Sequence, residues 1–111
     1  MKALLQSSPR EFGVGEIKIK DYGKIELKAW EMVSLISQHG SQCDLTATEW
    51  GFYLGASVND RMKREGFKVC IVKNRKGKIY INAVEEKQIE LFTKYLDEQE
   101  SHVLTWLDEM A

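Results

Sequence analysis

The feature that most constrains the fold of this chain is a strict alternation of charged and apolar residues in two short segments. Residues 16–20 read EIKIK and residues 24–28 read KIELK. A period of two places successive side chains on opposite faces, so each segment is predicted to be a half-buried β-strand. The three residues between them, DYG, end in the glycine that such a loop needs at a positive φ. We therefore predict a β-hairpin over residues 16–28, in which Ile19 lies opposite Ile25.

A second hairpin is predicted over residues 68–83. Its strands read KVCIVK and KIYINA, and residues 74–77, NRKG, form the turn between them. A four-residue turn would pair Val72 with Ile79 on one face. That face has the composition of a core, whereas the opposite face is mixed.

Two helices are predicted between these hairpins. Residues 29–39 place apolar side chains at helical spacing, and Gly40 follows as a C-terminal stop. Residues 46–49, TATE, have the spacing of a capping box, which predicts that a second helix begins there and ends at Gly66.

The chain ends in a long helical pattern over residues 85–110, with apolar residues close to a heptad repeat. An unbroken helix of that length would measure about 39 Å, whereas the radius of gyration of a domain this size is about 13 Å. The helix is therefore predicted either to break around residues 97–101 or to pack its end on a partner.

These elements predict an α+β fold in which two antiparallel β-hairpins form one sheet with about three helices. Residues 1–13 precede them as a variable entry segment, with a short strand over residues 2–5. The length of 111 residues suits a single domain over residues 1–111, and 43% apolar with 30% charged residues is ordinary globular composition.

The compartment predicted from the sequence is the cytoplasm. No apolar stretch approaches the roughly 20 residues needed to cross a bilayer, and the N-terminal residues lack the apolar core of a secretory signal. Cys43 lies in a polar connection and Cys70 in an apolar strand pattern, which predicts two free thiols rather than a disulfide.

Charge is segregated along the sequence. Residues 60–78 contain eight basic residues against two acidic ones, whereas residues 85–111 contain eight acidic residues against two lysines. The plainest interpretation is two solvated faces. The alternatives are a surface that contacts nucleic acid, a surface that steers a protein partner, or two segments that pair with each other within the monomer or across a dimer.

The nucleic-acid interpretation places the contact on a basic patch. Its residues are Arg61, Lys63, Arg64, Lys73, Arg75, Lys76 and Lys78, with Tyr80 for stacking. A helix-turn-helix over residues 47–66 fits only in its first half, because the second half would bury Arg61 and Arg64. The net charge of −1 and the acidic C-terminal segment also disfavour nucleic acid.

Catalytic and metal-binding patterns are weak. A set of two histidines and two cysteines exists in His39, Cys43, Cys70 and His102, but it lacks the paired spacing of zinc sites. His39 and Cys43 alone lack an orienting group and an oxyanion site. No catalytic residue, cofactor or metal site is predicted, and an enzyme is the least supported class.

The leading hypothesis is a non-enzymatic binding or regulatory protein that acts through protein–protein contacts as a homodimer. The predicted interface is the apolar end of the terminal helix, formed by Val103, Trp106, Leu107 and Met110. Nucleic-acid binding through residues 61–78 is the alternative, and a small-ligand binder or an enzyme without a recognised motif is the third. No membrane is expected as a partner.

Overall fold

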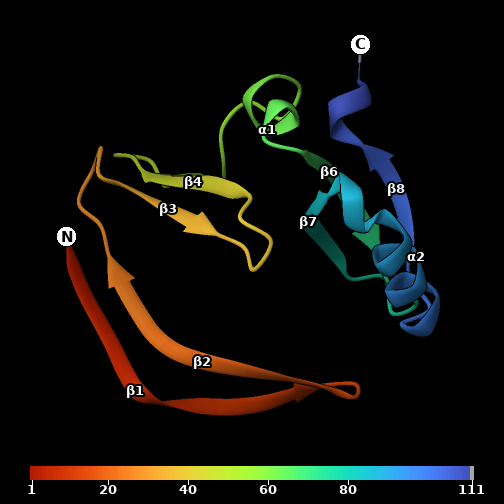
Figure 1. The fold of residues 1–111 in the computed structure, drawn as a ribbon, viewed down its shortest axis with the longest axis horizontal. Helices are drawn as coiled ribbons and strands as arrows, with labels where there is room; N and C mark the ends of the chain where they lie inside the picture. Colours follow the sequence, from red (N-terminus) through yellow and green to blue (C-terminus); the bar gives the residue numbers. More distant parts are fainter. Residues whose placement is uncertain (111) are drawn as a thin grey trace.

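The computed structural model describes residues 1–110, and strands occupy about half of them. They form three small antiparallel sheets, accompanied in these residues by two α-helices of four and ten residues (Figure 1). The prediction of an α+β fold with one sheet and about three helices is therefore wrong. The chain is mostly β, because several segments with helix-like apolar spacing pair as strands instead.

The first sheet is a long two-stranded ribbon, which we call the arm. It consists of β1, Lys2–Val14, and β2, Ile17–Glu26, joined by a tight turn in which Gly15 has a φ of 61°. Figure 1 shows the arm as a curved ribbon that runs apart from the other sheets. Within the described residues, neither of its strands hydrogen-bonds into another sheet.

The predicted hairpin over residues 16–28 is wrong, although its two alternating segments are both extended. They form one continuous strand, and residue Gly23 lies opposite Leu5 at an irregularity of the ladder with a φ of 121°. A Cβ at Gly23 would collide with the carbonyl oxygen of Leu4. Pairing with the N-terminal strand satisfies backbone groups on both sides of the irregularity in β2, which a short local hairpin would not do.

The second sheet replaces the two predicted central helices. It contains β3, Met32–Ile36, β4, Gln42–Ala47, and β5, Phe52–Tyr53, in the order β3-β4-β5. Gly40, predicted to end a helix, has a φ of 88° in the turn between β3 and β4. A short apolar run such as MVSLI fits a helix face and a strand equally well, so its period alone does not decide between them.

The predicted capping box does not start a helix. The Thr48 hydroxyl accepts a hydrogen bond from the Trp50 amide at 3.2 Å, and the Thr48 amide donates to the Gly51 carbonyl at 2.8 Å. Gly51 and Gly55 have φ values of 143° and 135°, which a helix excludes. The only α-helix in this described region is α1, Arg61–Arg64.

The third sheet confirms the predicted second hairpin. Its strands are β6, Phe67–Lys73, β7, Ile79–Glu85, and β8, His102–Trp106, in the order β7-β6-β8. The register differs by one residue from the prediction, because Val72 pairs with Tyr80 rather than with Ile79. The turn is longer by one residue, since the Asn74 side chain accepts hydrogen bonds from two amides within it, at 3.0 and 2.9 Å.

The predicted terminal helix is correct only in its first half. It comprises a 3₁₀ turn η1, Glu86–Gln88, and α2, Ile89–Glu98, and it ends within the range where a break was predicted. The following residues form β8 and a final 3₁₀ turn η2, Leu107–Glu109. β8 supplies the hydrogen-bonding partner for the second edge of β6, which is the most buried strand of the sheet.

The core lies on both faces of β6. Alternation along this strand directs Cys70 and Val72 toward α2, where they pack with Val84 and Leu96. Phe67 and Val69 point to the opposite face and pack against Met62 of α1.

Candidate protein-binding surface

The molecule exposes more surface than a compact chain of its mass. Its accessible surface is 8566 Å², whereas a compact monomer of 12.8 kDa exposes about 6,300 Å². The radius of gyration is 15.4 Å, against about 13 Å for a compact domain. The difference, about 2,300 Å² on that scaling, is comparable with an interface.

The apolar face of the arm near its tip contributes to this excess surface. In the ladder, Phe12 lies opposite Ile19 and Val14 opposite Ile17, so these four side chains share one face. Phe12, Ile17 and Ile19 are 41%, 48% and 41% exposed. A two-stranded ribbon with an uncovered apolar face is at best marginally stable in water, so this face requires a cover.

The charges of the arm neutralise one another. Arg10 donates to Asp21 at 3.1 Å, and the Arg10 guanidinium lies 5.1 Å from the centroid of the Phe12 ring. The Gly23 amide and then Arg10 hold the pKa of Asp21 below its usual value. On the other face, Glu11 lies opposite Lys20. The arm therefore presents an apolar surface without a dominant charge.

A second uncovered apolar face belongs to the third sheet. Ile71 pairs with Ile81, and Ile79 and Ala83 follow at spacings of two along β7, so these residues lie on the face opposite α2. Ile79 and Ile81 are 61% and 60% exposed. We call this surface the back face; it is defined by Ile71, Ile79, Ile81 and Ala83.

Further large side chains are exposed around β5. Trp50 packs edge to face on Tyr53 with ring centroids 5.3 Å apart, yet Trp50, Phe52 and Leu54 are all more than half exposed. Uncovered apolar groups therefore occur on all three sheets, and sequence periodicity missed this because it reports which side chains share a face but not whether anything covers that face.

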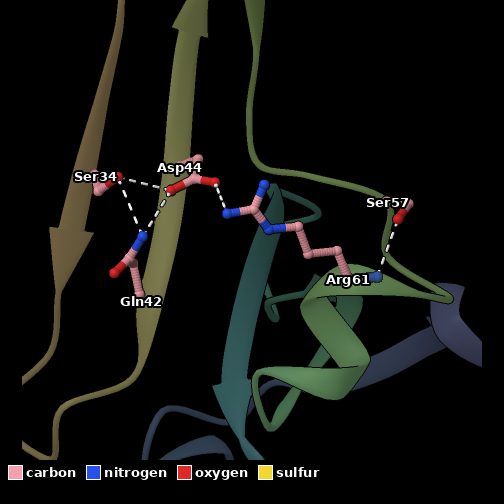
Figure 2. A network of polar contacts seen from close by, with 5 residues as sticks. All are labelled: Ser34, Gln42, Asp44, Ser57 and Arg61. Carbon is pink, nitrogen blue, oxygen red and sulfur yellow. Dashed lines mark hydrogen bonds and ion pairs between the residues drawn. The ribbon is translucent and has the colours of Figure 1, made fainter.

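A polar network ties the second sheet to α1 (Figure 2). The buried carboxylate of Asp44 accepts a hydrogen bond from Ser34 at 2.7 Å and forms an ion pair with Arg61 at 2.8 Å. Hydrogen bonds from Ser34 and Gln42, with the charge of Arg61, hold the pKa of Asp44 below its usual value despite burial. Since no buried polar side-chain atom in the described residues lacks a partner, this network is satisfied within the chain.

The residues predicted as a dimer interface are mostly packed within the single chain. Val103 and Trp106 lie against the core cluster around Cys70, and Leu107 lies against the cluster around Met62. Met110 is 62% exposed. The structure does not bring these four residues together as one exposed surface, and the homodimer stays a prediction.

The predicted basic patch is partly neutralised. Acidic partners contact three patch residues, Arg61, Arg64 and Arg75, and also Lys68 of the same basic segment, at 2.8 to 3.1 Å. Two of these, Lys68 and Arg75, reach into the acidic C-terminal segment, so the interpretation that the two segments pair within the monomer holds for them. Lys63, Lys73, Lys76 and Lys78 form no ion pair with residues 1–110, and Tyr80 is 53% exposed.

The cysteines and histidines do not form a site in the part of the chain that the structure describes. Cys43 is half-buried, Cys70 is fully buried, and both are free thiols. Burial is the main cause that raises the pKa of each thiol. Residues 1–110 contain no group of three or more metal-ligating side chains.

No helix within residues 1–110 has the length and hydropathy needed to cross a membrane. In comparisons with known proteins, no family model, no curated protein and no solved structure matched this chain.

Proposed function

We propose that this chain is a non-enzymatic binding or regulatory protein that acts through protein–protein contacts. The observation that carries the proposal is the exposed apolar surface of the arm and the back face. Each 100 Å² of apolar surface removed from water contributes about 2.5 kcal/mol, so a partner that covers these faces would gain substantial free energy. The expected compartment is the cytoplasm, which the two free cysteines support.

Nucleic-acid binding is the second candidate, and it depends on the lysines that have no acidic partner among residues 1–110. Lys73 is the last residue of β6, and Lys76 and Lys78 lie in the turn between β6 and β7. This turn also contains Arg75, which is held by Glu100 at 2.8 Å. The positive charge available for phosphate is therefore less than the sequence predicted, and the protein-binding proposal is preferred.

Site-specific photo-crosslinking in the cells that produce the protein tests the proposal. A photoreactive phenylalanine analogue is placed at Phe12, in the arm, and in a matched control at Lys94, an exposed position on α2. We expect an adduct that contains a second polypeptide from position 12 and none from position 94. An adduct with nucleic acid, or no adduct at position 12, would contradict the proposal.

A further inference from the structure

We propose that the occupant of the uncovered surfaces is a second copy of this chain, and that the arm of each copy packs on the back face of the other. This inference rests on the proposed function and names its partner. The contact joins Phe12, Ile17 and Ile19 of one copy to Ile71, Ile79 and Ile81 of its partner. In a two-fold dimer the contact occurs twice, so both faces of both chains are covered at once.

The excess surface of the whole molecule is large enough for a stable dimer rather than only a weak encounter. Each chain exposes about 2,300 Å² beyond the surface of a compact monomer of its mass, and permanent homodimers bury about 2,000–5,000 Å² in total. Two copies that each cover a large part of their excess therefore reach that range. A contact with a small ligand would leave most of this surface uncovered.

The two faces match in shape and chemistry. The arm near its tip is a ribbon of two strands, and the back face also spans two strands, β6 and β7. Such ribbons pack face to face at about 10 Å with apolar side chains between them. Beside the arm's apolar side chains, Arg10 is already neutralised by Asp21. On the back face, Lys73 lies opposite Ile79 and forms no ion pair with residues 1–110, so it has to stay at the hydrated edge of the contact.

An arm does not cover the back face of its own chain. The back face stays open, since Ile79 and Ile81 are 61% and 60% exposed. At the tip of the arm, Val14 lines a hollow with Tyr80, Tyr95 and Leu96, which lie on the α2 side of the sheet, and Ile81 also lines this hollow. Next to Val14, the α-carbon of Gly15 lies beside Gln99 at the end of α2, so that an added Cβ would come within 3.1 Å of its amide nitrogen.

The net charge favours a second copy over a charged macromolecule. The whole chain has a net charge of −1, so two copies repel each other only weakly. The arm, residues 2–26, has five basic and four acidic residues, and its net charge of +1 is too small to select a nucleic acid or an acidic peptide. Its apolar face is typical of the core of a homodimer interface, which is poor in charged residues.

The test measures the mass of the 111-residue chain by sedimentation equilibrium. We expect the parent to have twice the mass of one chain. Ile19→Lys in the arm and Ile81→Glu on the back face should each weaken dimerisation by about tenfold or more. The matched control is Leu91→Lys, at a leucine of α2 that is 64% exposed, and its mass should equal that of the parent.

Mixing distinguishes a lost contact from a lost fold. In an equimolar mixture of Ile19→Lys with Ile81→Glu, the lysine of one copy faces the glutamate of the other, while the second contact keeps its native residues. We expect the mixture to contain more dimer than either variant alone at the same total concentration. A monomeric parent overturns the inference, as does an unchanged mass in either variant or a mixture that stays monomeric.

The two proposals fail in different ways. A monomeric parent whose position 12 crosslinks to a different protein would overturn the second copy as partner and leave protein binding intact. A monomeric parent without any protein adduct would overturn both.

Discussion

Lys68 and Asp108, 40 residues apart in the chain, form an ion pair at 3.0 Å in which the Asp108 side chain is 1% exposed. The carboxylate also accepts a hydrogen bond from the Val69 amide at 3.3 Å, and Lys68 lies 5.0 Å from the centroid of the Trp106 ring. This pair fastens η2 to the central strand β6. It also connects the basic segment of the sequence to the acidic one.

Replacement of Asp108 by asparagine should destabilise the fold. The variant Asp108→Asn keeps the size of the side chain but removes the charge that Lys68 faces, which we expect to lower the free energy of unfolding by about 1–3 kcal/mol. Glu109→Gln is the matched control, since Glu109 is 60% exposed and contacts the same lysine; its effect should stay below about 1 kcal/mol. Urea unfolding measures both, and equal losses would contradict a special role for Asp108.

Stability should fall in acid. Burial raises the pKa of Asp108, but the hydrogen bonds from Lys68 and the backbone outweigh it, so the folded pKa lies below 3.8. The pKa of Asp44 is lowered too, chiefly by Ser34 and Gln42. Carboxyls with a depressed pKa stabilise the fold above their unfolded pKa and lose that contribution as the pH falls below it. We expect the urea midpoint to drop below about pH 4, and Asp108→Asn to show a smaller drop; an equal drop would contradict the assignment.

In alkaline solution stability should fall as well, because Lys68 loses the charge that pairs with Asp108. Hydrogen bonds to Asp108 and Glu109 raise the pKa of Lys68 above 10.5. A raised lysine pKa stabilises the fold below the unfolded value, and that contribution disappears as the pH rises through the folded pKa. Unfolding midpoints measured above about pH 10.5 should therefore fall for the parent and fall less for Lys68→Met.

Arg61 should contribute more to the free energy of unfolding than Arg64, although both residues lie in α1. Arg61 neutralises the buried carboxylate of Asp44 (Figure 2), whereas the partner of Arg64 is Asp60, whose side chain is 69% exposed. We expect Arg61→Gln to lower the free energy of unfolding by about 1–3 kcal/mol and Arg64→Gln by less than about 0.5 kcal/mol. A larger loss for Arg64→Gln would show that the Asp44 network does not secure the contact between the second sheet and α1.

Alanine variants at Gly51 and Gly55 should distinguish the stability lost through backbone strain from the stability lost through steric crowding. Gly51 and Gly55 both have positive φ, but a Cβ at Gly51 meets nothing within 4 Å, whereas a Cβ at Gly55 would lie 2.8 Å from the Met62 sulfur. Both alanine variants should lose about 1 kcal/mol or more through strain. Gly55→Ala should lose more than Gly51→Ala in thermal unfolding, because Met62 must also move. The reverse order would contradict the close packing of Met62.

The two hairpin predictions differ in outcome for an identifiable reason. Residues 68–83 carry strand residues on both sides of a turn whose asparagine and glycine act locally, and the structure confirms that hairpin. Residues 16–28 carry an equally clear period, but their partner is the N-terminal segment 2–14 rather than their own second half. Gly23 suits a loop and a bulge alike, so only the presence of a longer competing strand decides between them.

The helices that were predicted wrongly show the same limit of prediction from local sequence. Residues 32–36, MVSLI, and residues 102–106, HVLTW, both lie where apolar spacing indicated a helix, and both are strands. Five residues are too few for periods of 2 and 3.6 to be separated. The open edge of β6 determines the outcome for the second segment, since its unpaired backbone groups need a partner.

The sequence by itself determined that residues 17–20, 24–26, 68–73 and 79–83 are extended and that charge is divided along the chain, and it offered a break of the terminal helix at residues 97–101 as one of two alternatives. Those features depend on neighbouring side chains and local turn chemistry. Only the tertiary structure decided which strands pair, that Lys68 and Arg75 are neutralised by distant carboxylates, and that the arm and the back face remain uncovered. Pairing and coverage depend on segments far apart in the sequence, and their free energy is gained only when the whole chain, or a second copy, brings the surfaces together.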